Sequence, residues 1–296
     1  MALPAYATPG QRIWHYGYLT FCTLVLFFLV APLLVVIPMS FNAAPFLHLT
    51  PEMLMLDPKG YSTLWYKSLF GMCDAEFVSL WTSCTDKWVS GTINSFIIAT
   101  SSTGLATILG TLAALALSRP HMPFRRAMMA LMISPLIVPL IITASGMFFF
   151  FAKVHLVATL PGIVLAHAVL GLPFVVITVT ATLVGFDNTL MKAAANLGGT
   201  PIYNFFRIQM PLIAPGVISG ALFAFITSFD EIVIILFLGG PDQHTLPWQM
   251  WSGLREEISP TILAAATILV LLSIVLLTTL ELLRRRSERI RGISPA

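Results

Sequence analysis

Six long stretches without a charged residue constrain this sequence more than any other feature. They cover residues 13–51, 88–118, 127–152, 154–186, 208–229 and 258–280, and the fifth resumes past Asp230 and Glu231 to about Leu238. A helix that crosses a membrane needs about 20 mostly apolar residues, so each stretch can form one. Only 10% of the 296 residues are charged, whereas a soluble domain carries roughly 25%. The sequence therefore excludes an ordinary soluble enzyme and predicts an all-α membrane protein with six transmembrane helices.

Positive charges gather on one side of the predicted bundle. Loops rich in Lys and Arg stay on the cytoplasmic side of a membrane. If the N-terminus, the second loop, the fourth loop and the C-terminus are cytoplasmic, that side holds eleven of the 16 basic residues. The other five are Lys59, Lys67, Lys87, Lys153 and Arg255. We therefore predict a multi-pass protein with both termini in the cytoplasm, and we expect basic residues at its ends to contact membrane lipid.

The large outer loop, about residues 42–88, is expected to carry structure of its own. Tyr61, Leu64, Trp65, Leu69 and Phe70 have helical spacing. They predict either a helix lying on the outer surface or a docking surface for an external partner. The same loop contains Cys73 and Cys84, which can form a disulfide in an oxidising compartment or remain two free thiols.

Motifs for catalysis and for nucleotide binding are absent from the sequence. It contains no GxxxxGK[ST] loop for phosphate, no HExxH metal motif and no GxSxG nucleophile turn. We therefore predict no enzymatic activity, no catalytic residue, no metal site, no cofactor bound by this chain and no nucleic-acid partner. His167 lies in the middle of a predicted span, where we expect a neutral imidazole bonded to a neighbouring helix.

The fourth loop, about residues 187–211, is too polar to span a membrane and too patterned to be a simple linker. Asp187 or Asn188 can cap a short helix over Thr189–Leu197, which Gly198 and Gly199 end. Thr200 and Pro201 then predict a second short helix to about Gln209, followed by Pro211. An ordinary amphipathic connector is the alternative interpretation.

This loop resembles the "EAA" loop of the permeases of ABC importers. The family pattern is Glu-Ala-Ala, then Gly four residues after the second Ala, then a later Leu-Pro. Ala193, Ala194, Gly198 and Pro211 match it, whereas Lys192 replaces the Glu and Met210 replaces the Leu. Because Lys192 reverses the charge, a salt bridge made by the family Glu cannot be carried over.

Downstream segments resemble the permeases of spermidine/putrescine importers. The matching runs are Ser228–Glu231, Phe237–Pro241, Thr245–Pro247, Gln249–Arg255 and Glu257–Thr261. The resemblance covers nearly the whole chain except the Cys-containing part of the outer loop. It implies import of polyamines such as putrescine or spermidine. An ABC permease for an amino acid, a phosphonate or ferric ion is the first alternative, and a membrane enzyme or channel without an ATPase is the second.

The resemblance also implies an architecture and a set of partners. It implies one permease domain over residues 1–296 with the type I importer fold, located in the inner membrane. The partners would be two ATPase subunits that bind ATP and Mg, a second and different permease subunit, and a periplasmic substrate-binding protein. A cytoplasmic coupling helix would dock on the ATPase through Lys192, Ala193, Ala194, Ala195, Leu197, Gly198, Gly199 and Pro211.

Two adjacent acids, Asp230 and Glu231, interrupt the fifth span. Carboxylates inside a membrane are costly and are tolerated where they face a cavity or a cation. Either acid, or both, can line a path for a polyamine, or both can bond to neighbouring helices and hold the bundle together. On the same span, Gly216 and Gly220 lie four residues apart, a spacing that permits close helix packing.

Overall fold

A computed structural model describes residues 8–45, 47–72, 86–119, 121–256 and 259–290. Across these ranges all regular elements are helices, and the one strand-like pairing is a bridge between Asn42 and Tyr61. Five segments are long and apolar enough to cross a membrane: α1 (Pro9–Met39), α5 (Lys87–Leu117), α8 (Leu160–Val184), Pro201–Phe229 and the first part of α14 (Thr261–Ile290). A bent pair, α6 (Arg125–Ile137) and α7 (Leu140–Lys153), makes a sixth. The predicted all-α fold with six spans is confirmed.

The third span is broken rather than continuous. The axes of α6 and α7 differ by 105°. Val138 ends α6 with an extended backbone, and Pro139 follows it. The ring of a proline disfavours the helical conformation of the residue before it, so the sequence Val138-Pro139 accounts for the break. Pro135 lies one turn earlier without ending α6.

The chain divides into two compact units, and the first contains residues 1–84 and Gly253–Leu269. Its short elements are α2 (Pro51–Leu54), the 3₁₀ turn Pro58–Gly60 and α3 (Leu64–Leu69). Trp65 is buried against Ala264, and its indole Nε1 donates to the Asn42 carbonyl at 2.7 Å. A hydrogen bond of 2.6 Å joins the hydroxyls of Ser40 and Tyr66. The predicted helical spacing in the outer loop thus produces one short helix that is anchored by its aromatic residues.

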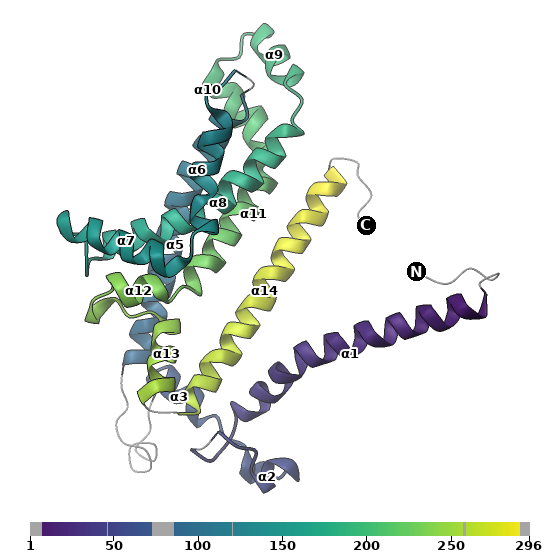
Figure 1. The fold of residues 1–296 in the computed structure, drawn as a ribbon, viewed down its shortest axis with the longest axis vertical. Helices are drawn as coiled ribbons and strands as arrows, with labels where there is room; N and C mark the ends of the chain where they lie inside the picture. The colour runs from purple at the N-terminus through teal and green to yellow at the C-terminus, as the bar shows by residue number, and fades with distance from the viewer. Residues whose placement is uncertain (1–7, 46, 73–85, 120, 257–258, 291–296) are drawn as a thin grey trace. The chain divides into compact units, whose positions relative to one another are not determined.

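The second unit contains Thr85–Ser252 and Val270–Ala296, and three helices form its centre. Figure 1 shows α5, α8 and α11 (Met210–Phe229) side by side. Their shared core consists of small and branched side chains: Ala106, Ala114, Ala168, Val175, Val179, Leu183, Ile213, Val217 and Ala224. A second core joins α7 and α8 to α12 (Val233–Leu238), a short helix after the end of α11. Small residues at helix interfaces let backbones approach closely, which favours association in lipid.

Gly216 and Gly220 lie where α11 packs closely on α8. A Cβ atom at Gly220 would lie 2.8 Å from the Cα of Val175, and one at Gly216 would lie 2.9 Å from the Cβ of Thr182. Both distances are shorter than side chains normally allow. The predicted close packing of this glycine pair is confirmed.

We expect Gly220→Ala to destabilise the protein because the added methyl group would push against the backbone of α8. Overpacking of this kind costs about 1–3 kcal/mol in unfolding free energy. Gly104→Ala on α5 is the matched control, since nothing lies within 4 Å of a Cβ placed there. Thermal unfolding in detergent should show a lower midpoint for Gly220→Ala and no loss for Gly104→Ala. Equal midpoints for the two variants would contradict this account of the interface.

Candidate functional site

The loop that resembles the EAA loop begins with a capping turn. The Asp187 carboxylate accepts hydrogen bonds from the Thr189 backbone N–H at 2.9 Å and from the Thr189 hydroxyl at 2.7 Å. These bonds stabilise the charged form, so they lower the pKa of Asp187. α9 (Thr189–Asn196) starts directly after this turn. The predicted start of the short helix is confirmed, and Asp187 supplies the capping side chain.

Two glycines end α9 in a Schellman motif. The Gly198 N–H donates to the Ala195 carbonyl, and the Gly199 N–H donates to the Ala194 carbonyl, each at 3.0 Å. Gly198 has a φ of +87°, a left-handed conformation that residues with a Cβ rarely adopt. Gly199 is tightly surrounded, because a Cβ there would overlap the side-chain oxygen of Asn204 and lie 3.0 Å from the Ala194 carbonyl oxygen. The glycine pair therefore sets the direction in which the chain leaves α9.

The eight residues predicted to couple to an ATPase comprise one buried residue, the half-buried Gly199 and an exposed set of six. Ala194 is buried beneath α9. The exposed set is Lys192, Ala193, Ala195, Leu197, Gly198 and Pro211. Leu197 leaves 90% of its surface exposed, although it is a large apolar side chain at the end of the helix. The exposed residues of α9 and its C-cap therefore combine small side chains with Lys192 and with two apolar side chains, Leu190 and Leu197.

The second short helix does not end at Gln209 as predicted. Thr200 caps it by accepting from the Tyr203 N–H at 3.3 Å, and α10 (Pro201–Asn204) follows. A π-helical turn (Phe205–Gln209) then leads without interruption into α11. Pro211 lies in the first turn of α11, and the wider π turn before it accommodates a residue that has no backbone N–H. The short helix is therefore the first part of the fifth span.

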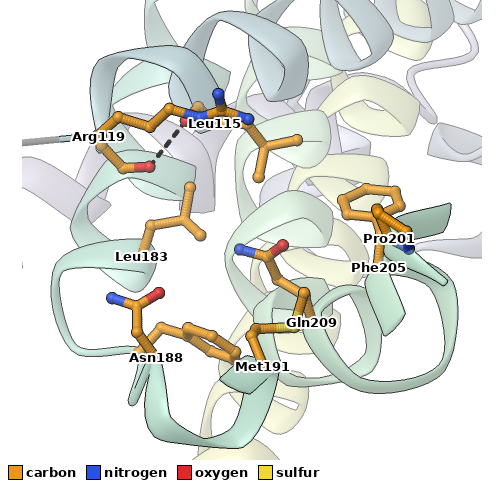
Figure 2. Close-up of a pocket in the computed structure, with 10 residues that line it drawn as sticks. Leu115, Arg119, Leu183, Asn188, Met191, Pro201, Phe205 and Gln209 are labelled. Carbon is orange, nitrogen blue, oxygen red and sulfur yellow. Dashed lines mark hydrogen bonds between the residues drawn. The ribbon is translucent and has the colours of Figure 1, made fainter. Parts of the chain in front are cut away.

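A pocket of about 390 Å³ lies between this loop and the neighbouring ends of α5 and α8. Figure 2 shows Arg119 on one side of the pocket and Phe205 and Pro201 on another, with Asn188, Met191 and Gln209 between them. The lining is both polar and apolar, and it comes from four separate helices or their ends. Residues of the loop and residues at the ends of α5 and α8 therefore line the same pocket.

Asp230 and Glu231 have different surroundings. Glu231 is buried, and its carboxylate accepts from the backbone N–H groups of Val233 and Ile234, the latter at 3.0 Å. It therefore caps the N-terminus of α12. Asp230 is exposed, and its own N–H makes the last helical hydrogen bond of α11, to Ile226 at 3.1 Å. The two acids do not lie inside a continuous helix, as the sequence suggested, but at the break between α11 and α12.

Aromatic rings surround the end of α11. The ring of Phe229, the residue before Asp230, lies 5.1 Å from Phe96 on α5 and 5.6 Å from Phe225 on α11. Phe96 is 43% exposed. Phe229 itself is buried, so Phe96 is the exposed ring of the group. An exposed carboxylate and an exposed aromatic ring are groups that bind an organic ammonium ion, through charge and through cation–π contacts respectively. This arrangement is the candidate site for a cationic solute.

Two details of this region were not predicted from the sequence, and one further prediction concerns residues that the structure does not describe. The capping role of Glu231 was missed, although an acid just before a short apolar run is a signal for a cap. His167 is bonded to a neighbouring helix, as predicted, and the partner that the sequence did not identify is Ser228 on α11, at 2.9 Å. The proposed bridge between Cys73 and Cys84 lies outside the described residues.

Comparisons with known proteins agree with these features. Residues 106–289 match the family described as "Binding-protein-dependent transport system inner membrane component". The spermidine/putrescine transport system permease protein PotC of Haemophilus influenzae is 29% identical over 90% of this chain and 96% of its own. The putrescine transport system permease protein PotI of Escherichia coli K12 is 33% identical over 82% of this chain and 81% of its own.

A solved structure supports the same fold. A bacterial ABC transporter chain involved in import of the acidic polysaccharide alginate superposes with a TM-score of 0.68 over 94% of this chain and 99% of that chain, at 13% identity. At this identity the match concerns the fold alone. The family match covers more than half of the sequence. It includes the EAA-like loop, and it also includes the break between α11 and α12 that contains Asp230 and Glu231, which we call the acidic break. The chain is therefore a multi-pass permease subunit that belongs to the inner membrane components of binding-protein-dependent transport systems.

Proposed function

We propose that this permease forms half of the translocation path of an ATP-driven importer for polyamines such as putrescine and spermidine. The observation that carries the proposal is the exposed Asp230 at the end of α11, where the exposed ring of Phe96 contacts the buried ring of Phe229, the residue before Asp230. Linear polyamines carry several ammonium groups, which can pair with a carboxylate through charge and with a ring face through cation–π contact. The names of the relatives PotC and PotI support the same substrate class.

We propose that α9 docks in a groove of an ATPase subunit and transmits its movement to the bundle. The exposed small residues of α9 and the projecting Leu197 support this role. The continuity of α10 and α11 supplies a rigid connection from the loop to the acidic break. Two ATPase subunits would bind ATP and Mg, because this sequence contains no phosphate-binding loop of its own.

We further propose that a second, different permease subunit completes the path and that a periplasmic binding protein delivers the substrate. One set of six spans offers Asp230 from one side only, so a path needs a second wall. The basic residues support an orientation with the loop 187–211 and both termini in the cytoplasm, since eleven of 16 then lie inside. Basic side chains near the C-terminus would contact anionic lipid headgroups.

Reconstitution tests the proposal directly. The chain is assembled in lipid nanodiscs with its ATPase, second permease and binding protein, and ATP hydrolysis is measured with putrescine, spermidine or butylamine. We expect stimulation by the two polyamines and little by butylamine, which carries a single ammonium group. A complex that assembles but responds to an amino acid, a phosphonate or ferric ion would contradict the polyamine assignment. Failure of any ATPase to co-purify with the chain would contradict the ATP-driven mechanism.

A further inference from the structure

A buried chain of hydrogen bonds, here called the string, joins α5, α8 and α11 at the last turn of α11, just before the acidic break. His167 on α8 contacts the Ser228 hydroxyl through Nδ1 at 2.9 Å. The Ser228 hydroxyl on α11 contacts that of Ser102 on α5, also at 2.9 Å. All three side chains are buried, and His167 is fully so. The apolar clusters on these helices consist of alanine, valine, leucine, isoleucine and phenylalanine.

The geometry of the string makes Ser228 its central member. A serine hydroxyl has one proton to donate and two lone pairs to accept, so Ser228 can serve both neighbours at once. The Ser102 hydroxyl also lies 3.2 Å from the Ala99 carbonyl of its own helix. The His167 Nε2 is buried and has no hydrogen-bond partner among the described residues. Only the Nδ1 side of the imidazole therefore connects α8 to α11.

We propose that His167 is a positioning residue that acts through Ser228 to fix the end of α11, and with it Asp230, for passage of the cationic solute. The proposal rests on the polyamine path proposed above. Ser228 lies two residues before Asp230, within the last turn of α11. Beyond this turn the backbone leaves the helix, and Glu231 already caps α12. The string and the Glu231 cap therefore hold the residues before and after Asp230, and Asp230 is left as the exposed member between them.

The hydrogen bonds of the string are costly to break in this environment. A buried polar group that loses its partner costs about 1–3 kcal/mol, because no water replaces it. Substituting His167 by leucine leaves Ser228 without its α8 partner. Ser228→Ala leaves His167 without its partner and leaves Ser102 with only the Ala99 carbonyl of its own helix. Each change frees the last turn of α11 to shift or fray, which moves Asp230 without touching its charge.

Two conservative variants separate a positioning role from general packing. An asparagine at position 167 places an amide near the site of Nδ1 and can keep the bond to Ser228. A glutamine of similar polarity places its amide near Nε2 and cannot. In the reconstituted complex we expect His167→Leu, His167→Gln and Ser228→Ala to raise the polyamine concentration for half-maximal ATPase stimulation about tenfold. His167→Asn should stay within about twofold of the unaltered protein. Equal behaviour of the asparagine and glutamine variants would overturn the proposal.

A second readout does not depend on the substrate. Asp230→Cys is introduced in a background where Cys22, Cys73 and Cys84 are serine, and its rate of modification by a cationic methanethiosulfonate reagent is measured. We expect His167→Leu to change this rate at least threefold and His167→Asn to leave it unchanged. If this pattern is found, and the complex that retains Asp230 assembles but is not stimulated by polyamines, the proposed substrate is refuted and the positioning role is supported. If polyamines stimulate the complex that retains Asp230, but substitution of His167 does not change the labelling rate of Asp230→Cys, the positioning role alone is refuted.

Discussion

Replacing Gly198 by valine is expected to reduce polyamine-stimulated ATP hydrolysis at least tenfold while the permease remains folded. Gly198 ends α9 with a φ of +87°. A left-handed backbone costs an L-residue about 1–2 kcal/mol, and a β-branched side chain is penalised more. Because about 1.4 kcal/mol corresponds to a factor of ten, the Schellman turn would open or rotate in a large fraction of molecules. α9 would then approach the ATPase at the wrong angle.

Gly198→Asn is the matched control for this variant. Asparagine is close to valine in size but tolerates the left-handed region, since its polar side chain bonds to the local backbone. Nothing lies within 4 Å of a Cβ at Gly198, so neither side chain collides with the permease itself. We expect the asparagine variant to keep most of the stimulated activity. If it loses as much as the valine variant, the side chain obstructs the ATPase surface and the backbone explanation is wrong. ATP hydrolysis and co-purification of the ATPase distinguish a docking defect from a coupling defect.

The parts of this fold that the sequence predicts are those fixed by local chemistry. Charge-free stretches locate the spans, because a membrane interior admits few charges whatever the neighbouring helices are. The Gly198-Gly199-Thr200-Pro201 run locates the turn after α9, because the backbone of glycine and the capping hydroxyl of threonine act within a few residues. Neither inference needs knowledge of what packs against the segment.

The parts that the sequence does not predict depend on distant contacts or on the continuity of the backbone. The string Ser102–Ser228–His167 joins residues 126 and 61 positions apart, and serines at such positions carry no periodic signal. A proline in the sequence does not by itself show whether a helix ends there, because the outcome depends on the neighbouring residues. Val138-Pro139 breaks the third span, whereas Pro211 is accommodated after a π-helical turn and the helix continues. The residues around each proline, rather than the proline itself, decide between the two outcomes.

Asp230 and Glu231 illustrate the limit most directly, because they are adjacent and nearly identical in chemistry. The end of α11 at Phe229 directs one acid outward and turns the other back onto the first N–H groups of α12. Had the helix continued through both residues, the two carboxylates would have pointed about 100° apart, as side chains on one α-helix do. The helix break places Asp230 at the surface and Glu231 against the N-terminus of α12. Neither acid by itself allows the position of this break to be predicted.

Because Asp230 is exposed and Glu231 caps α12, we expect substitutions of the two acids to have different effects in an uptake assay. Asp230→Asn keeps the size of the side chain and removes its charge, so we expect uptake of radiolabelled putrescine to fall at least tenfold with no change in thermal stability. The attraction between unit charges a few ångströms apart is about 4 kcal/mol at an effective dielectric constant of 20, and neutralisation removes it. Asp230→Glu restores the charge and is expected to recover part of the uptake.

Glu231→Ala should instead destabilise the protein, because two N–H groups of α12 lose their acceptor. Loss of a helix cap costs about 0.5–2 kcal/mol, which should lower the midpoint of thermal unfolding and the yield of assembled complex. Glu231→Gln retains an amide oxygen in the same place and should recover most of the stability, since capping needs an acceptor rather than a charge. The putrescine concentration for half-maximal uptake should stay unchanged in both variants once activity is normalised to assembled complex. A change in that concentration for Glu231→Gln together with normal uptake by Asp230→Asn would reverse the assignment, and the buried acid would then be the one that meets the substrate.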